Sequence, residues 1–460
     1  MLRILSVGSR RGEVLHENRL IVPIPVRIRP IRSKLDMTQR PPHRLLPGPD
    51  APGKAGLGAD RPAAAGDRAA APVGPPRRPP VADRILILRL GAMGDVIRTL
   101  PAVAAIRSLY PGAHISWLVE PASAGVVDAA GFVDEALVFP RADLGDALRE
   151  GDGLSFACQL RGFMDTLRRR RFELTVDFHG LFKSGLLARL SGAQARFGFA
   201  PPAGREFSSL FVNRMVVSPA PELSRYDRNE ALVCALGADI RLPERPLLKP
   251  SSLARARLSA RLRAVGRERA SGFVLIHPGS SAGARHKRYS PEAWAAVAKY
   301  LAGEGSEVWL AAGPNRHERN LSEEIVRRAE GALVAAPETR SFDDLLALVA
   351  RAGVFVACDS GPLHAASLAG IPVVQLLGPT HPIQNEPWRA TPARRLHVPL
   401  ACSPCRRGCA DPVCMRAIPA AAVAETTRDL LRTSSAALTA ALETRAEIPV
   451  SGSTRGEPAR

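Results

Sequence analysis

Short apolar runs alternate along the chain with segments in which apolar residues recur at helical spacing. The first pair is the clearest. Residues 85–90 are apolar except for Arg89, the run ends at Gly91, and residues 96–109 then show helical periodicity with an expected kink at Pro101. Further strands are predicted at residues 114–119, 133–139 and 174–178, and a further helix at residues 184–190. This alternation indicates an α/β domain built on a parallel sheet with helices on both faces.

The alternation returns after a Pro-rich link at residues 241–250. Strands are predicted at residues 273–277, 307–312, 354–357 and 372–376. Ser290 is expected to cap a helix with Pro291 in its first position, and Ser341 to open another with Asp344 in the manner of a capping box. Two Rossmann-like βαβ domains are therefore predicted, at residues 83–245 and 246–425, with a C-terminal helix and tail at residues 426–460. A cleft between such domains is a preferred ligand site.

Residues 1–82 have a different composition, with 14 of the 41 prolines together with Ala, Gly and Arg. Such a segment buries too little apolar surface to offset the entropy of ordering, so we predict a disordered extension. It is either a tail of the protein or the product of a misplaced start of translation.

The formal net charge of +19 is spread along the chain, with +8 in residues 1–83 and +11 in the remainder. Positive charge favours anionic partners, although it also serves solubility alone. The basic residues are dispersed and aromatic residues make up only 5% of the chain, which leaves little stacking surface for single-stranded nucleic acid, so no nucleic-acid partner is expected. No apolar stretch reaches the roughly 18 residues of a membrane-spanning helix. The odd number of cysteines, seven, argues against a secreted disulfide scaffold, and a cytoplasmic location is expected.

The turn after the first predicted strand lies where nucleotide-binding folds hold phosphate, at the beginning of a helix. Here, however, Gly91 and Gly94 are spaced Gly-x-x-Gly, and a carboxylate, Asp95, opens the helix. Asp95 would repel a phosphate. It either caps the helix or presents a functional carboxylate at the carboxyl end of the strand.

Three loops of the second half follow predicted strands and have the composition of a diphosphate site. Their candidate ligand residues are Ser280, Ser281 and Lys287 in the first loop, Asp359, Ser360, Gly361 and His364 in the second, and Thr380 in the third. Hydroxyls, free N–H groups and a lysine can hold a diphosphate, and a carboxylate can hold sugar hydroxyls. Each loop alone is also explained as an ordinary turn or a capped helix start. Their convergence on one sheet edge favours the ligand interpretation.

Several motifs, taken together and in their order along the chain, are specific enough to indicate a protein family. They are Leu90-Gly91-Ala92-Met93-Gly94-Asp95 with Thr99-Leu100-Pro101, Asp177-Phe178-His179-Gly180-Leu181-Phe182-Lys183-Ser184, Arg205-Glu206 with Asn213-Arg214, His277-Pro278-Gly279-Ser280 with Lys287-Arg288-Tyr289, Asp359-Ser360-Gly361-Pro362-Leu363-His364, and Gly378-Pro379-Thr380. Over residues 84–420 the chain resembles the ADP-heptose:lipopolysaccharide heptosyltransferases, a glycosyltransferase family with the two-domain GT-B fold.

The resemblance implies an inverting transfer of heptose from ADP-heptose, a nucleotide sugar, to an anionic glycolipid acceptor of the lipopolysaccharide inner core. It places the catalytic base at Asp95 and the donor in the second domain. Asp359 is then expected to hold heptose hydroxyls and His364 to brace the loop. Gly94, Lys183, Arg205 and Arg214 match acceptor-side positions, although each of the three cations is also explained as a solvated surface charge.

Four cysteines are crowded at Cys402, Cys405, Cys409 and Cys414. Only the first pair has zinc-ligand spacing and no nearby histidine completes a pattern, so we interpret the segment as structural, with a bound zinc as the alternative. The proposed chemistry needs no metal or other cofactor.

Two further alternatives remain open from the sequence. Apolar residues at helical spacing before the basic run at residues 168–171 form either a helix that docks on anionic lipid at the inner face of the inner membrane or an ordinary sheet-covering helix. At the level of function, the rivals are a GT-B transferase with another nucleotide sugar or acceptor, and a non-catalytic nucleotide-binding module in which Asp95 is only a helix cap.

Overall fold

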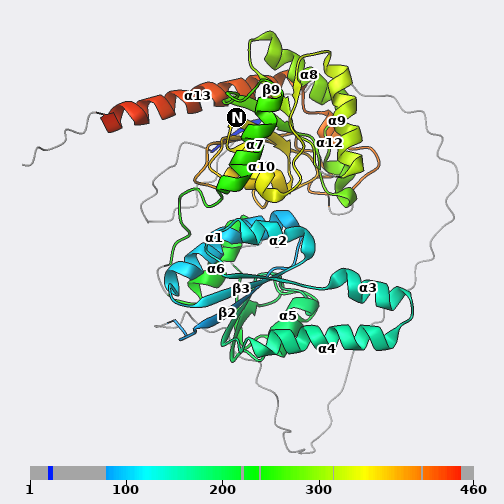
Figure 1. Ribbon diagram of the computed structural model, residues 1–460, viewed down its shortest axis with the longest axis vertical. Coiled ribbons are helices and arrows are strands. Elements are labelled where there is room, and N and C mark those ends of the chain that lie inside the picture. The colour runs from blue at the N-terminus through cyan, green and yellow to red at the C-terminus, as the bar shows by residue number, and fades with distance from the viewer. Residues whose placement is uncertain are drawn as a thin grey trace, which may run out of the picture. The chain divides into compact units, whose positions relative to one another are not determined.

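Two parallel β-sheets within one compact unit of the chain organise the molecule (Figure 1). The structure, a computed structural model, describes residues 19–23, 79–218, 222–237, 240–313, 315–405 and 408–446. The predicted α/β class is confirmed, and the fold is GT-B.

The first sheet has the strand order β4-β3-β2-β5-β6-β7. Its strands are β2 (Arg84–Leu88), β3 (His114–Val119), β4 (Glu135–Val138), β5 (Leu174–Asp177), β6 (Ala195–Phe199) and β7 (Arg214–Val216). The connecting helices are α1 (Met93–Leu109), α2 (Pro121–Asp128), α3 (Arg141–Arg149), α4 (Gly153–Arg169), α5 (Phe182–Leu190), the 3₁₀ helix η1 (Ser208–Phe211) and α6 (Arg225–Cys234).

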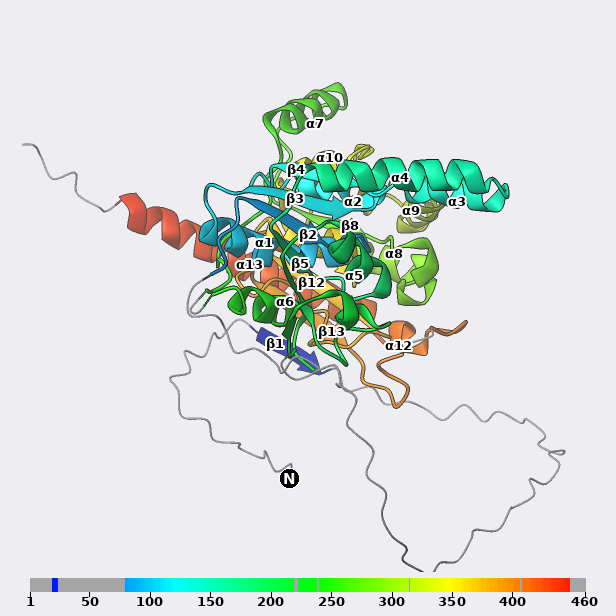
Figure 2. The ribbon, with the colours of Figure 1, turned by 90° about the horizontal axis from the view of Figure 1, so that it is seen from below.

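Alternate residues of β2 supply the two cores of this sheet. Ile85 and Ile87 face α1, α2 and α6, whereas Leu86 and Leu88 face α3, α4 and α5, and all four side chains are fully buried. The two helix layers are visible on opposite faces of the sheet in Figure 1, and α3 and α4 lie side by side in Figures 1 and 2. A strand buried on both faces needs an unbroken apolar run, which explains why β2 was readable from the sequence.

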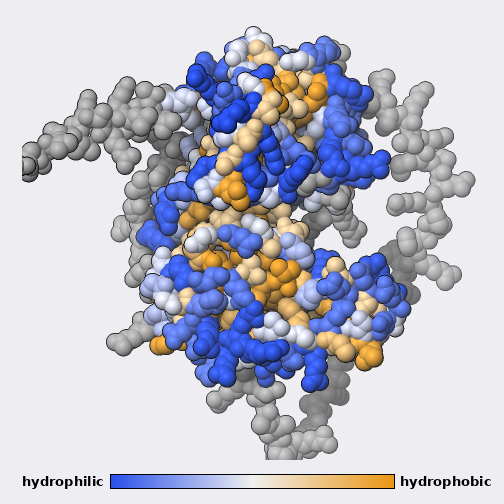
Figure 3. Space-filling model, in the orientation of Figure 1, coloured by the Kyte–Doolittle hydropathy of each residue, from blue (hydrophilic) through white to orange (hydrophobic). Residues whose placement is uncertain are grey.

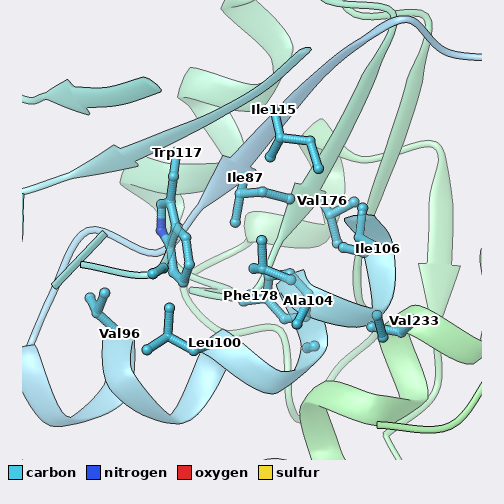
Figure 4. Close-up of a cluster of buried hydrophobic side chains, with 14 of the residues drawn as sticks. Ile87, Val96, Leu100, Ala104, Ile106, Ile115, Trp117, Val176, Phe178 and Val233 are labelled. Atoms are coloured by element: carbon cyan, nitrogen blue, oxygen red, sulfur yellow. The ribbon is translucent and has the colours of Figure 1, made fainter. Parts of the chain in front are cut away.

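Helix α1 is held against the first sheet along its length. Its Val96, Leu100 and Ala104 point at Ile87 and Trp117 of the sheet in the close-up of the core (Figure 4). Pro101 lies inside the helix, at a buried position. Because the body of α1 is fixed in this way, the first turn of the helix is held at the carboxyl end of β2.

The second sheet has the order β1-β13-β12-β11-β8-β9-β10. Its strands are β1 (Arg19–Pro23), β8 (Phe273–His277), β9 (Val308–Leu310), β10 (Val334–Ala335), β11 (Ala352–Cys358), β12 (Val373–Leu377) and β13 (Ala393–His397). Its helices are α7 (Ser252–Ala264), the 3₁₀ helix η2 (Ala282–Lys287), α8 (Pro291–Gly303), α9 (Arg316–Ala329), α10 (Phe342–Val349), α11 (Gly361–Leu368), α12 (Val413–Arg416) and α13 (Ala420–Ala446).

Residues of β8 divide between two cores in the same way. Val274 and Ile276 pack with α8, α9 and α13, and Phe273 and Leu275 pack with α7, α10 and α11. The outer side of α9 is hydrophilic (Figure 3), as expected for a helix that buries one face only. Both predicted helix starts are present, since the Ser290 hydroxyl accepts from Ala293 N–H and the Ser341 hydroxyl from Asp344 N–H.

One part of the sequence prediction differs from the structure. Most of residues 1–82, predicted to be disordered, lies outside the described residues, but Arg19–Pro23 forms strand β1, in register with β13. The run Leu20-Ile21-Val22 can extend a sheet whose edge strand β13 offers free backbone groups. The second sheet therefore recruits a strand from outside the predicted boundaries of 246–425. Helix α13 covers the predicted C-terminal helix, and residues 447–460 also lie outside the described part of the chain.

Candidate active site

Asp95 lies in the first turn of α1, as its third residue. The N-cap position belongs to Ala92, which makes no side-chain cap hydrogen bond. The carboxylate of Asp95 instead contacts arginine side chains from three different elements. Helix capping therefore does not explain the carboxylate at this position.

Three guanidinium groups surround this carboxylate. Arg89, just after β2, pairs with Oδ2, while Arg98 Nη2 donates to Oδ1 at 2.7 Å and Arg225 Nη1 donates to the same oxygen at 2.5 Å. The side chain of Asp95 is 17% exposed. Burial acts to raise its pKa, but the charges of Arg89, Arg98 and Arg225 hold the pKa well below the usual range.

Arg98 connects Asp95 to the second sheet domain. Its Nη1 lies 3.0 Å from Nε2 of His364 on α11 and donates to Oδ1 of Asn385 at 3.1 Å. His364 Nε2 is in turn 3.3 Å from Asp359 Oδ1, and Lys287 Nζ is 2.9 Å from Asp359 Oδ2. A continuous line of polar contacts thus runs from Asp95 to Lys287.

The charges along this line are set by burial and by neighbouring groups. Burial and the charge of Arg98 lower the pKa of His364 to about 4, so its ring is neutral near pH 7. In the neutral ring, Nε2 either accepts from Arg98 or donates to Asp359. Burial alone would raise the pKa of Asp359, but the hydrogen bond from His364 and the charges of Lys287 and Arg98 hold it well below the usual range.

The first of the three predicted donor loops is closed by its own hydrogen bonds. Ser280 is buried, its hydroxyl donates to the carbonyl of Ala284 at 3.0 Å, and Arg288 Nε donates to that hydroxyl at 2.9 Å. Ser281 is exposed and precedes η2, the turn that ends at Lys287. Ser280 therefore shapes the loop, whereas Ser281 and Lys287 project from it.

The second and third loops offer hydroxyls that have no internal partner. Ser360 Oγ and Thr380 Oγ1 are buried and make no hydrogen bond within the described part of the chain. Gly361, the first residue of α11, lies against Gly94, such that a carbon added at Gly94 would be 3.5 Å from the Gly361 Cα. The beginnings of α1 and α11 therefore lie against each other at these two glycines.

The basic residues expected on the acceptor side are distributed unevenly. Lys183 pairs with Glu120 at 3.2 Å, with its ammonium group over the Phe139 ring. Arg205 is exposed, and its backbone N–H donates to the carbonyl of Gly180, in the loop between β5 and α5. Arg214 begins β7, the edge strand, and the register through β6 and β5 places it level with Ile87, near the carboxyl end of β2. Two strands, β5 and β6, separate β7 from β2, so Arg214 lies at the same end of the sheet as Asp95 but to one side of it.

The cysteine-rich segment supports the third loop. Cys405 N–H donates to Pro379 O at 2.7 Å, and a carbon added at Gly378 would overlap Met415 and Cys414. All four thiols are free, and the described residues contain no group of three or more His, Cys, Asp or Glu arranged to hold a metal ion. Among the described residues, the segment packs against the loop that contains Thr380.

Helix α4, which carries the basic run, covers the first sheet with its apolar side. Met164 and Leu167 are buried, and Phe163 packs edge-to-face on Phe139. Arg168 and Arg169 are exposed at its end. The apolar residues are therefore used within the fold, as the sheet-covering alternative predicted. No helix in the described part of the chain combines the length and apolarity needed to cross a membrane.

Sequence reasoning did not identify Arg98, Arg225 and Asn385 as members of this site. They come from α1, α6 and the loop after β12, and the distance of Arg225 from Asp95 along the chain is 130 residues. Arg89 carried one visible signal, a single charge within an apolar strand.

The fold and this arrangement of loops define a GT-B glycosyltransferase, and comparison with known proteins agrees. The family model described as "Glycosyltransferase family 9 (heptosyltransferase)" matches residues 160–412. Lipopolysaccharide heptosyltransferase 1 of Pseudomonas aeruginosa is 28% identical over 304 residues, which cover 65% of this chain and 79% of that protein.

Two solved structures have the same fold. The glycosyl transferase family 9 protein of Veillonella parvula superposes with a TM-score of 0.62 at 19% identity, covering 76% of this chain and 97% of its own. The heptosyltransferase WaaC of E. coli superposes with a TM-score of 0.59 at 21% identity, covering 75% and 99%. The chain belongs to glycosyltransferase family 9, the heptosyltransferases, and the predicted family is confirmed.

Proposed function

We propose that this glycosyltransferase moves a heptose from ADP-heptose to a hydroxyl of a lipopolysaccharide inner-core acceptor, with inversion at the anomeric carbon. The observation that carries the proposal is the line of contacts from Asp95 through Arg98 and His364 to Asp359 and Lys287. It joins a candidate base to candidate ligands for the donor. Solved structures of WaaC are described with ADP and with ADP-2-deoxy-2-fluoro heptose, which supports the same donor here.

In the proposed reaction, Asp95 takes the proton of the acceptor hydroxyl as its oxygen attacks the anomeric carbon. The bond between that carbon and the diphosphate oxygen breaks on the opposite side, and ADP leaves with the electron pair. Lys287, the free hydroxyls of Ser360 and Thr380, and the first turn of α11 are suited to stabilise charge on the diphosphate. Asp359 is suited to bind heptose hydroxyls.

The proposed acceptor is an anionic glycolipid, and the proposed site of action is the cytoplasmic face of the inner membrane. The relatives' names, lipopolysaccharide heptosyltransferases, support an acceptor of this class. Exposed Arg168 and Arg169 at the end of α4 are suited to contact anionic headgroups. Neither binding of the acceptor nor contact with the headgroups requires a metal or other cofactor in this proposal.

Replacing Asp95 by Asn tests the proposed chemistry. Loss of a general base predicts a fall in kcat of about 10²–10⁴-fold with unchanged affinity for ADP-heptose. Turnover is measured by release of ADP, and affinity by calorimetry with the donor alone. The exposed Asp128, at the end of α2, provides the matched control Asp128→Asn, which should keep full activity.

A folded Asp95→Asn protein with wild-type turnover would refute the role of the base. The donor is tested separately by comparing ADP-heptose with other nucleotide sugars in the wild-type protein. Absence of both binding and turnover with ADP-heptose would leave the family intact and overturn the proposed donor.

A further inference from the structure

The three arginines around Asp95 differ in how firmly they are held. Arg98 is 8% exposed and is also bonded to Asn385 and His364, and Arg89, 15% exposed, donates to Phe178 O at 3.0 Å. The side chain of Arg225 is 39% exposed, and within the described part of the chain Asp95 is the partner recorded for its guanidinium. Arg225 is therefore the partner that an incoming group can draw away.

Positive charge exceeds negative charge beside Arg225. Arg228 lies one turn further along α6, with its guanidinium 4.8 Å from the centroid of the Phe199 ring and bonded to Ala203 O at 3.3 Å. Burial and the charges of Arg89, Arg225 and Arg205 lower the pKa of Arg228 to about 10, and Asp95 acts in the opposite direction. A cluster of cations around a single carboxylate is arranged to bind a further anion.

Other titratable groups lie near Asp95 and its arginine partners. Burial raises the pKa of Asp177, at the end of β5, to about 6, against the opposing charge of Arg89, so this carboxylate is charged near pH 7. His179, in the loop after β5, has its pKa lowered to about 4 by burial and the charge of Arg89, and His364 on α11 is neutral for similar reasons. Asp359, a carboxylate of the second sheet domain whose charge acts on Arg98, is paired with Lys287. Near pH 7 the charge balance at Asp95 therefore changes when the guanidinium of Arg225 moves.

In the structure, both oxygens of the Asp95 carboxylate already accept from guanidinium groups. Oδ2 is paired with Arg89, and Oδ1 accepts from both Arg98 and Arg225. A carboxylate held in this way is a weak base, because each guanidinium stabilises its charged form. Departure of one arginine would therefore raise the pKa of Asp95 and make it a stronger base.

We propose that Arg225 gates Asp95, and that Arg225 and Arg228 together bind an anionic group, a carboxylate or a phosphate, which the acceptor carries close to the attacked hydroxyl. When the anion binds, the guanidinium of Arg225 moves from Asp95 Oδ1 to the anion. The freed oxygen then accepts the proton of the hydroxyl while its oxygen bonds to the anomeric carbon and ADP departs with the electron pair. This inference rests on the proposed function of Asp95.

The gate has a direct consequence for selectivity. A neutral acceptor, or water, leaves Arg225 on Asp95 and so meets a weak base. An anionic acceptor draws Arg225 away from Asp95 and so strengthens the base for its own reaction. The donor is thereby protected from hydrolysis while the acceptor is absent, without any closing segment.

The experiment compares an acceptor that bears a carboxylate with its carboxamide, and a third acceptor that bears a phosphate at the same place. In the wild-type protein, kcat/KM for the carboxylate form should exceed that for the carboxamide by about ten- to a hundredfold, the worth of a charge-assisted hydrogen bond. The phosphate arm shows which anion the site prefers. In Arg225→Gln this preference should collapse toward equality, with a loss of turnover for the anionic acceptor and no loss for the carboxamide.

Controls separate the gate from a general loss of structure. Arg225→Lys keeps the charge but not the planar fork, and should retain part of the preference for the anion. Arg269→Gln removes an exposed arginine on the connection between α7 and β8 and should behave as wild type. Thermal unfolding of each variant verifies folding.

The pH dependence provides a readout that a simple binding residue would not change. The base works only when deprotonated, and the charge of Arg225 lowers the pKa of Asp95. Removing this charge raises that pKa, so the acid-side fall of kcat/KM should move to higher pH in Arg225→Gln. An unchanged acid limb, or an equal loss for carboxylate and carboxamide acceptors, would overturn the gate.

Binding without turnover distinguishes the gate from the proposed function. Asp95→Asn removes the carboxylate that competes for Arg225, so it should bind the carboxylate-bearing acceptor more tightly than wild type while failing to turn it over. Calorimetry measures this binding in the absence of donor. If turnover in Asp95→Asn is normal, the base assignment is wrong; if turnover is lost but acceptor affinity does not rise, the gate is wrong and the base assignment stands.

Discussion

At the scale of single residues, the hydroxyls of the donor loops fall into two groups. Ser280 is satisfied inside the protein by Ala284 and Arg288, whereas Ser360 and Thr380 are buried without a partner among the described residues. A buried hydroxyl without a hydrogen bond costs folding free energy, which favours the interpretation that a ligand supplies the missing partner.

Replacing Ser360 and Ser280 in turn by Ala should separate these roles. Ser360→Ala removes no internal hydrogen bond, so its stability should be unchanged or slightly raised while the Kd for ADP increases about tenfold or less. Ser280→Ala loses bonds within the loop and should cost about 1 kcal/mol of unfolding free energy. Chemical denaturation and calorimetry with ADP measure both quantities. Equal behaviour of the two variants would contradict the distinction.

The same scale shows what the sequence could and could not predict about the site. Asp359 directly follows an apolar strand, and Asp95 and Lys287 lie in the segments that follow two others, which made all three candidates. Arg98 lies within α1 and Arg225 begins α6, in segments of ordinary helical composition, and only the packing of α6 on α1 brings Arg225 to Asp95. Contacts between elements distant in sequence leave no local pattern.

At the scale of elements, strands with an apolar run were predictable, including the edge strand β4, whereas short or polar strands were not. The strands expected at residues 114–119 and 273–277 match β3 and β8. Both strands are mostly buried and apolar, although β3 begins with the exposed His114. By contrast, β13 reads Ala-Arg-Arg-Leu-His, and β7 and β10 have three and two residues. Short or polar strands carry no apolar run, so their pairing is decided by the sheet that receives them.

Two helical glycines provide a test of element packing. Gly162 in α4 has open space around it, whereas a carbon added at Gly185 in α5 would lie 2.9 Å from the carbonyl oxygen of Ser208 in η1. Gly162→Ala should stabilise the protein by about 0.5–1 kcal/mol, because alanine has the higher helix propensity. Gly185→Ala has the same propensity gain but must displace backbone, so it should destabilise. Urea unfolding of the two variants measures the sign, and stabilisation by both would contradict the close approach of α5 and η1.

At the scale of the whole molecule, acid stability depends on buried groups in both sheet domains. Burial lowers the pKa of His179, His277 and His364 to about 4, and burial raises that of Asp177 to about 6. Between about pH 4 and pH 6.5, the three histidines are protonated in the unfolded chain but neutral in the folded chain. Asp177 acts oppositely, because its folded form is the one that holds the extra proton above pH 3.8.

These shifts predict that unfolding free energy falls as pH drops from about 6.5 toward 4. Near pH 5 the three histidines outweigh Asp177 by about two protons, which corresponds to roughly 2–3 kcal/mol per pH unit. Urea unfolding at pH 7, 6 and 5 measures the slope. Replacing buried His277 by Asn should reduce it by about one proton, or roughly 1.4 kcal/mol per pH unit, whereas replacing the exposed His114 serves as the matched control. A slope that His277→Asn leaves unchanged would mean that this ring is protonated in the folded protein, and would assign the acid sensitivity to other groups.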